Sequence, residues 1–360
     1  MLVRSIGRGL VNWVMTGGSS IYDRLVDSLW RPDGPKPEEK RRPVHTIGTG
    51  ASGFFAASDN AAHFCTAEHF QKGRTVPVSV RFSNGSGNAT RHDGWSDLRG
   101  MATRFHLDDD RQAGVAADLL AITVPGFFTP TVDEFLDFAK WALPQPYLRQ
   151  SPWYKFVKLL NLEQPRRNPY PRETISPDIG AEAFADRYDN TKLPVFLDAS
   201  IGAPASFARA PYHAVHSFIV TGSDGARRHV RFNWQPTLGV LNKDPQQPPE
   251  DVYLEHELRE RLAAGPASFS LMMAIGEGGD DFNDSSRAWS FQRRRVFMGT
   301  MTIDRYADDQ WTDNEHMSFN PCRLVDGIEP SDDPILHARR HLYEVSRLRR
   351  GAPLCPFARS

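Results

Sequence analysis

The chain has 360 residues, of which 40% are hydrophobic and 24% are charged, and its formal net charge is −1. This composition is typical of a globular protein with one large domain or two ordinary ones, and the near-neutral charge argues against nucleic acid as a partner. Three widely separated cysteines, Cys65, Cys322 and Cys355, predict neither a disulfide framework nor a thiolate metal site.

The first 40 residues are expected to form a helix and an extended arm, ahead of a core that spans residues 41–360. Apolar side chains between residues 2 and 14 fall roughly at helical spacing, which predicts an amphipathic helix packed on the core or on a second subunit. Proline and charge in WRPDGPKPEEKRRP, residues 30–43, predict the arm. No apolar run reaches the roughly 18 residues that cross a bilayer, and residues 10–14 are too short for a secretory signal. A cytoplasmic location with no transmembrane segment is therefore expected.

Beyond the arm, short β-type runs alternate with clusters of Gly, Asn and Asp. This pattern predicts an antiparallel sheet or barrel within an α+β fold. The predicted strands are residues 76–82, 100–106, 118–124, 216–220 and 229–234. GSDG at residues 222–225 predicts a hairpin between the last two runs. Helices are predicted at residues 131–143, 249–263 and 333–350.

One glycine motif is misleading. GTGASG, with Gly48, Gly50 and Gly53, matches the dinucleotide-binding fingerprint G-x-G-x-x-G. That fingerprint requires a buried strand before it and a helix after it. The preceding KRRPVH is no buried strand, and no apolar helix follows. The sequence therefore argues against a nucleotide site here.

Five segments resemble, in order, the signatures of the catalase superfamily. They are RPVHTIGTGASGFF at 42–55, VRFS at 80–83, DLRGMATRF at 97–105, PGFF at 125–128 followed by Phe135 and Phe138, and FNPCRLVDGIEPSDDPILHARRHLY at 319–343. The pattern as a whole resembles the short catalase-related peroxidases. The resemblance implies an α+β fold with a catalase-type antiparallel β-barrel core and surrounding helices, without the C-terminal helical domain of typical catalases.

The resemblance implies haem b as the cofactor, with Tyr343 as the axial ligand of the iron. A phenol has an unperturbed pKa of about 10, so ligation as phenolate needs the metal charge and preferably a nearby cation. Arg339 precedes Tyr343 by four residues, so on a helix the two side chains share a face. The resemblance adds that Arg339 pairs with His216 and Asp333 as a proximal relay.

On the opposite face of the haem, the resemblance places His45 as the group that moves a proton during peroxide cleavage. Histidine is suited to accept and return a proton near neutral pH. Ser83 would bond the other ring nitrogen and fix its tautomer. The remaining histidines considered, His106, His213 and His229, are expected to be structural.

The resemblance also assigns residues that hold the porphyrin. The planar forks of arginines suit its carboxylates, and Phe side chains suit its apolar faces. The matching positions are Arg42, Arg81 and Arg350 for the propionates, with Arg41 as an alternative one position away, and Phe128 and Phe135 for the ring.

Two departures from typical catalases indicate a different balance of activities. Where catalases carry an Asn pair before the PxFF segment, this chain has Ile122 and Thr123. Loss of a fixed amide donor weakens the positioning of peroxide, which disfavours dismutation. The chain also stops at Ser360, soon after the proximal helix, so NADPH binding is not expected and the haem edge is expected to be more open to organic donors.

The expected function is therefore haem-dependent reduction of hydrogen peroxide, or of organic peroxides, with oxidation of small organic reductants and weaker catalase activity. Two alternatives remain. A catalase-fold hydroperoxide-converting enzyme resembling the allene oxide synthases has Thr before the distal His, where this chain has Val44. A non-enzymatic haem carrier or sensor would need neither His45 nor Ser83. A second copy of the chain, in a homodimer, is the candidate protein partner.

Overall fold

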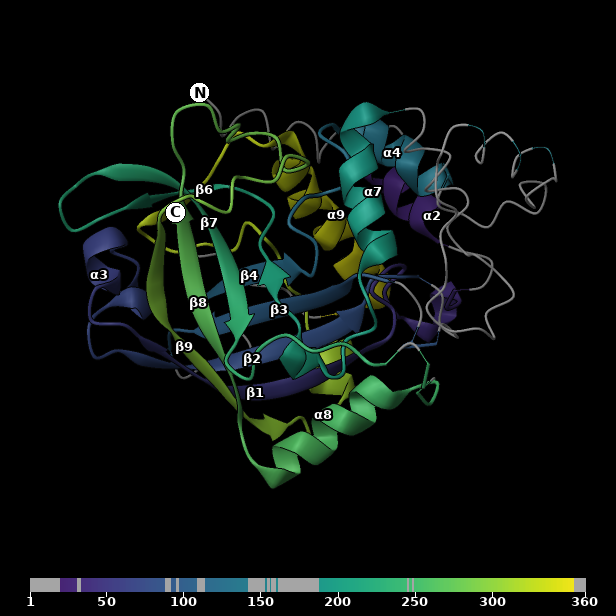
Figure 1. Cartoon of the computed structure of the whole chain (residues 1–360), viewed down its shortest axis with the longest axis horizontal. Coiled ribbons are helices and arrows are strands. Elements are labelled where there is room, and N and C mark those ends of the chain that lie inside the picture. Colours follow the sequence, from purple (N-terminus) through teal and green to yellow (C-terminus); the bar gives the residue numbers. More distant parts are fainter. Residues whose placement is uncertain are drawn as a thin grey trace.

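A closed antiparallel barrel forms the centre of the computed structural model, which describes residues 20–30, 34–87, 92–94, 97–108, 114–141, 153, 156, 160, 188–244, 246–247 and 249–352 (Figure 1). Its strands are β1 (Gly48–Ala57), β2 (Thr75–Asn84), β3 (Arg99–His106), β4 (Ala116–Ile122), β5 (Tyr212–His213), β6 (Phe218–Thr221), β7 (Arg227–Pro236), β8 (Ala267–Ile275), β9 (Arg295–Tyr306) and β10 (Ile328–Pro330). Within the described ranges, eight of them close in the order β7-β5-β4-β3-β2-β1-β9-β8, because β8 also pairs with β7. Strands β6 and β10 extend the sheet from β7.

Side chains of β2 show how the barrel wall separates a core from a second face. Val76, Val78 and Phe82 alternate along the strand and are at most 1% exposed within the apolar core. On the other face, the first residues of β2 are exposed, whereas Arg81 and Ser83 are buried. A polar pair buried on the outer face of a strand indicates that other elements cover this part of the wall.

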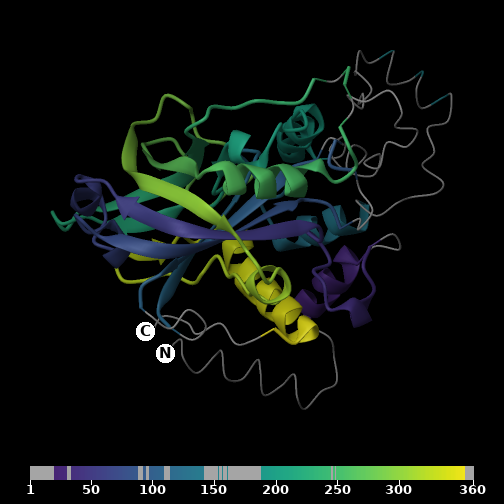
Figure 2. The same cartoon turned by 90° about the horizontal axis from the view of Figure 1, so that it is seen from below.

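Helices supply that cover. They are α2 (Ile21–Leu29), α3 (Ala61–Phe64), α4 (Val132–Trp141), α7 (Asp189–Ser200), α8 (Tyr253–Ala264) and α9 (Pro334–Arg350), with short 3-10 or π turns at Pro37–Glu39, Glu68–Phe70, Phe207–Arg209 and Trp311–Glu315. Helix α9 crosses below the barrel with α2 beside it (Figure 2). A second apolar cluster, Leu25, Val26, Ala139 and Leu342, joins α2, α4 and α9.

Helix α9 is specified by its own ends. The Asp333 carboxylate accepts hydrogen bonds from the N–H groups of Ile335 and Leu336, and Pro334 occupies the first turn, where its missing N–H costs nothing. Gly351 ends the helix with φ of 65°, a conformation that glycine adopts without strain. The helix predicted at 333–350 is confirmed, because α9 begins and ends within one residue of those limits.

The predicted fold class is confirmed, and most predicted elements coincide with observed ones. The five predicted strands correspond to β2, β3, β4, β6 and β7, and the three predicted helices to α4, α8 and α9. The GSDG hairpin joins β6 to β7, with Gly225 at φ of 72°. The sequence did not predict strands β1, β5, β8, β9 and β10 or helices α2, α3 and α7. The helix predicted between residues 2 and 14 lies outside the described residues.

The misleading glycine motif lies in β1, where glycine permits close approach of neighbours. A Cβ on Gly48 would stand 2.6 Å from the guanidinium carbon of Arg81, and a Cβ on Gly53 would overlap the carbonyl oxygen of Thr302 on β9. Because glycine has no side chain, β1 can pack closely against β9 and leaves room for Arg81.

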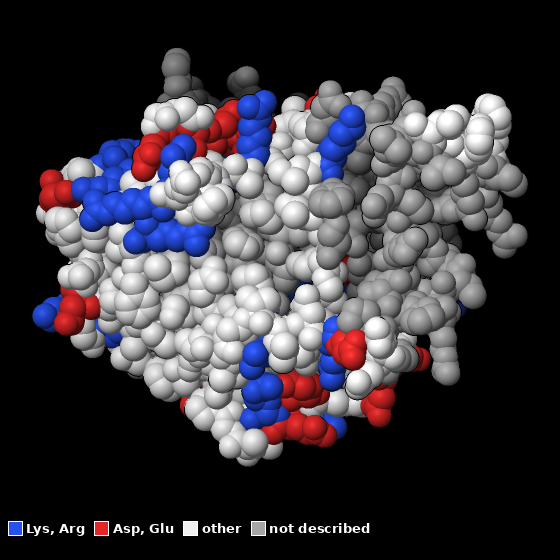
Figure 3. All heavy atoms as spheres, viewed as in Figure 1, with Lys and Arg blue, Asp and Glu red and all other residues white. Residues whose placement is uncertain are grey.

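Surface charges are mixed in sign. On the face shown in Figure 3, acidic side chains lie beside basic clusters. Ion pairs such as Arg293 with Asp280 and Arg227 with Glu329 join groups of this kind. Across the described ranges, no helix has both the length and the apolar character that crossing a bilayer requires.

Candidate active site

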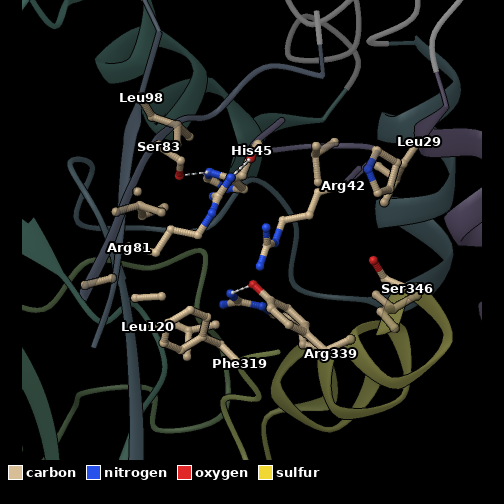
Figure 4. Close-up of a pocket in the computed structure, with 18 of the residues that line it drawn as sticks. Leu29, Arg42, His45, Arg81, Ser83, Leu98, Leu120, Phe319, Arg339 and Ser346 are labelled. Atoms are coloured by element: carbon tan, nitrogen blue, oxygen red, sulfur yellow. Dashed lines mark hydrogen bonds between the residues drawn. The ribbon is translucent and has the colours of Figure 1, made fainter. Parts of the chain in front are cut away.

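The outer faces of β2, β3 and β4 form the floor of a cavity (Figure 4). Strand register places Ser83, Gly100 and Ile122 side by side in one row, and the next row holds Arg81 and Leu120. Helices α9, α2 and α4 lie over this floor, and the cavity contains about 1190 Å³ free of protein atoms, part of it open to solvent. The cavity therefore takes its walls from both the barrel and the helices that cover it.

One face of α9 lines the cavity. The lining residues of this helix recur at intervals of three and four, as one face of an α-helix requires. They are Arg339, Leu342, Tyr343, Ser346 and Arg350.

Tyr343 and three further predicted residues form a continuous chain of hydrogen bonds. The Arg339 guanidinium donates to the Tyr343 hydroxyl at 3.0 Å and to Nε2 of His216 at 2.8 Å. Nδ1 of His216 lies 2.6 Å from an oxygen of Asp333. The structure therefore brings together the four residues that the resemblance groups on the proximal side.

The contacts of His216 determine its protonation state. Because Arg339 donates to Nε2, this nitrogen accepts, and Nδ1 carries the proton and donates to Asp333. Burial lowers the pKa of His216 to about 4, although the Asp333 carboxylate opposes the shift. Burial alone would raise the pKa of Asp333, but several smaller effects, led by the hydrogen bond from His216, together outweigh it and the pKa is lowered. The pair is thus a neutral imidazole and a carboxylate, which keep Arg339 oriented toward Tyr343.

His45 lies on the opposite side of the cavity from Arg339, the residue bonded to the Tyr343 hydroxyl (Figure 4). Its Nδ1 is 3.0 Å from the Ser83 hydroxyl, which leaves Nε2 as the nitrogen able to serve a ligand. The backbone of His45 has φ of 53°, an uncommon value for a residue other than glycine, and its N–H and C=O are fixed by Gly85 and Arg81. A Cβ on Gly100 would stand 2.9 Å from the imidazole, so this glycine provides the space for the ring.

Burial and nearby positive charges keep the imidazole of His45 neutral. Burial lowers the pKa of His45 to about 3, and the positive charges of Arg81, Arg339 and Arg42 act in the same direction. A neutral imidazole can accept a proton at any pH well above this value.

Three arginines gather at one end of the cavity around Glu315, a residue that the sequence did not single out. The Glu315 carboxylate pairs with Arg42 at 3.2 Å and with Arg81 at 3.1 Å, and its carbonyl oxygen accepts from Arg350 at 2.6 Å. Burial alone would raise the pKa of Glu315, but the charges of Arg81 and Arg42 outweigh it and the pKa is lowered. Arg41, the alternative, is 45% exposed and lies outside this cluster.

The cluster fits a dianionic ligand. Three guanidinium groups and one carboxylate leave two positive charges, the number that balances the two propionates of haem b. The Nε atoms of Arg81 and Arg350 are buried and have no hydrogen-bond partner within the described part of the chain. Because a buried donor without an acceptor is costly, these atoms suit the acceptor oxygens of a bound carboxylate.

Aromatic and aliphatic side chains also line the cavity that holds the Tyr343–Arg339 and His45–Ser83 pairs. Phe128 and Phe135, the candidates for contact with the porphyrin ring, line the cavity, and the ring of Phe128 stacks on that of Phe138 at 4.8 Å. Phe127 and Phe319 also line it and were not predicted. An apolar cavity of this kind suits a porphyrin ring better than a polar cofactor.

Ile122 and Thr123, which stand where catalases carry an Asn pair, have different surroundings. Ile122 lines the cavity, whereas the Thr123 hydroxyl accepts a hydrogen bond from the backbone N–H of Arg99 at 2.9 Å. His213, expected to be structural, pairs with Ile122 across β4 and β5 and lines the cavity as well. Of the other two histidines, His106 bonds Ser79 and His229 stacks on Phe282, as structural residues do.

Part of the cavity comes from the first 40 residues. Val26 and Leu29 of α2 line it, so this helix belongs to the same site as α9. The division of the chain at residues 40 and 41 stays a prediction.

Comparisons with known proteins agree with this geometry. The family model for Catalase matches residues 37–162 and 182–354. A catalase-related peroxidase of Mycolicibacterium paratuberculosis is 33% identical over 340 residues, which is 94% of this chain and 97% of that protein. A catalase-related peroxidase of Synechococcus elongatus is 26% identical, with 97% and 94% covered. Catalase-2 of Bacillus subtilis is 25% identical over 88% of this chain but only 46% of its own length.

Solved structures share the fold. A fungal catalase superposes with a TM-score of 0.70 at 20% identity, covering 87% of this chain and 60% of that one. Catalase A of Saccharomyces cerevisiae gives a TM-score of 0.70 at 19% identity, with 86% and 61% covered. Because the family model matches most of this chain and one relative is 33% identical over 94% of it, the chain belongs to the catalase family.

Proposed function

We propose that this protein is a haem b peroxidase that reduces hydrogen peroxide with electrons from small organic donors and dismutes peroxide more weakly. The observation that carries the proposal is one cavity that holds the Tyr343–Arg339 pair, the His45–Ser83 pair and the arginine cluster around Glu315. The names of the relatives, catalase-related peroxidase and catalase, support peroxide as the oxidant.

Three groups of residues would hold the cofactor: the iron ligand, the arginines and the aromatic side chains. Haem would supply an iron that exchanges electrons with peroxide. Tyr343 would bind that iron through its oxygen, and Arg339 would stabilise the phenolate by its charge. The propionates would be held by Arg42, Arg81 and Arg350, and the ring by Phe128 and Phe135.

His45 would move the proton that peroxide cleavage requires. Nε2 would accept a proton from one peroxide oxygen and return it to the other, which then leaves as water. Ser83 holds Nδ1, so the ring keeps one orientation during both transfers. Neither residue is needed by a non-enzymatic haem carrier, which makes them the discriminating positions.

Two steady-state assays on the same preparation test the proposed function. Oxygen release from hydrogen peroxide reports dismutation, and consumption of a phenolic donor reports peroxidase activity. We expect both, with donor oxidation the more prominent. A haem-loaded protein that performs neither reaction would be a carrier or sensor, and one that rearranges fatty-acid hydroperoxides without a donor would be the hydroperoxide-converting alternative.

The rate constant for reaction with hydrogen peroxide is expected to stay constant from about pH 8 to pH 5. His45 must be neutral to accept a proton, and because its pKa is lowered to about 3 it remains neutral throughout this window. A histidine with the ordinary pKa of about 6.5 would lose roughly tenfold by pH 5.5. Rapid mixing across the pH range measures the constant, and a decline centred near the ordinary value would contradict the assignment.

Ser83→Ala is expected to slow the reaction with peroxide about tenfold, the lower end of typical outer-sphere effects. The base remains, but its ring loses the bond that orients it. Ser79→Ala is the matched control, because Ser79 lies on the same strand and makes the same kind of bond, at 2.9 Å, to His106. Equal rates in the two variants would exclude an orienting role for Ser83.

Ile122→Asn is expected to raise the ratio of oxygen release to donor oxidation. Dismutation requires a second peroxide in a good attack geometry, and the amide would supply the donor that Ile122 lacks. Ile122 is the position to change because its side chain lines the cavity, whereas that of Thr123 is bonded to Arg99. Ile122→Leu controls for altered packing. If the Asn and Leu variants keep the same ratio, the departure at this position does not govern the balance.

A further inference from the structure

A second cleft shares a wall with the candidate active site. It contains about 740 Å³ free of protein atoms, open solvent included, and is lined by Val26, Asp27, Trp30, Arg41, Pro43, Ser346, Arg349 and Arg350. Val26, Pro43, Ser346 and Arg350 line both spaces. Ser346 stands on the side of the active-site cavity away from Ser83 (Figure 4). A molecule in this cleft would therefore sit one side chain away from the cofactor cavity, on the side of the arginine cluster.

The charges of the cleft favour an anion at Arg41. Arg349 is engaged by acidic groups of α2, with Asp27 at 2.5 Å and Asp23 at 3.3 Å. Within the described part of the chain, the ion pair of Arg41 is a 4.0 Å approach to Glu39, and both side chains are nearly half exposed, so this pair is weak. Arg350, on the shared wall, is one of the three arginines assigned to the propionates, so Arg41 is the charge that the cleft itself offers to an anion.

Trp30 provides an aromatic surface beside this charge. It ends α2, whose Asp27 and Val26 also line the cleft. An indole offers a large, rigid contact for another ring at little cost in conformational entropy. An arginine and an indole in one cleft suit a ligand with an aromatic ring and a carboxylate.

We propose that Trp30 and Arg41 form a binding site for anionic phenols, such as phenolic carboxylates, which serve as the organic donors. This inference rests on the proposed function and names its donor class. In the overall reaction two phenols each give up one electron and one proton to become phenoxyl radicals, and hydrogen peroxide takes up both electrons and both protons to become two molecules of water. The carboxylate binds Arg41 and takes no part in the chemistry.

A matched pair of donors tests the site. 4-Hydroxycinnamate and its methyl ester carry the same phenol, but only the acid is anionic. The wild type is expected to oxidise the acid with the higher kcat/KM, and Arg41→Gln to reduce the acid-to-ester ratio about fivefold, the effect of losing one exposed ion pair. Arg259→Gln, the same change at an exposed position of α8, should keep the wild-type ratio. Trp30→Leu should raise KM for both donors.

Direct binding gives a readout independent of turnover. Equilibrium dialysis of 4-hydroxycinnamate without peroxide should show binding that weakens in Arg41→Gln and, because the charge is exposed, at high salt. An acid-to-ester ratio that is the same in Arg41→Gln as in wild type, with unchanged dialysis, would overturn the donor site while leaving the peroxidase proposal standing. Failure to oxidise either donor would overturn the peroxidase proposal and the donor site together.

Discussion

Tyr343→Phe is expected to lose most of its haem, or to retain it with an altered ferric spectrum. The substitution removes only the oxygen that would bind the iron, and in the structure this oxygen is held by Arg339 alone among the described residues. Loss of an outer-sphere partner typically costs roughly 10–100-fold in metal affinity, so loss of the ligand itself should cost more. Haem content per chain and the absorption spectrum of the purified variant measure the effect.

Tyr306→Phe is the matched control, because Tyr306 donates its hydroxyl proton to Glu255 outside the cavity. Arg339→Ala should perturb the ferric spectrum less than Tyr343→Phe, since the phenolate would keep the iron but lose its cation. A Tyr343→Phe spectrum identical to wild type at full haem content would remove Tyr343 from the proximal position.

His45→Ala is expected to bind haem normally and to react with hydrogen peroxide about 10²–10⁴-fold more slowly, the usual contribution of a positioned acid–base group. His45→Gln separates the two tasks of the side chain, because an amide can still bond Ser83 but cannot shuttle a proton. Rapid mixing of each variant with peroxide gives the rate constant. A wild-type rate in His45→Gln would exclude proton transfer by this residue.

The sequence predicted those elements whose signals are local. Helix α9 has an Asp cap, a Pro in its first turn and a Gly after its last turn. All the residues that determine where it begins and ends therefore lie within about 20 positions of one another. The spacing of Arg339 and Tyr343 then follows from helical geometry. Strand β2 was recognisable in the same way, as a short β-type run that ends at the Gly- and Asn-rich cluster NGSGN.

What the sequence did not predict depends on contacts between distant segments. Strand β1 is rich in glycine because it meets β9 closely, a reason that only the paired strand reveals. His213 enters the cavity because strand register sets it beside Ile122. Glu315 meets Arg42 and Arg81 from more than 200 positions away, and nothing in its local sequence distinguishes it from a surface carboxylate.

The absorption spectrum of the purified protein, recorded before and after addition of hydrogen peroxide and then of a phenolic donor, tests whether this protein is a haem peroxidase with a tyrosine ligand. We expect a Soret band with high-spin ferric, tyrosinate-type features, a spectral change on adding peroxide, and return to the starting spectrum when the donor is supplied. A protein that shows no Soret band after expression with ample haem, and binds no haem when haemin is added, would not be a haem enzyme. A haem spectrum that peroxide leaves unchanged would contradict the proposed peroxidase activity.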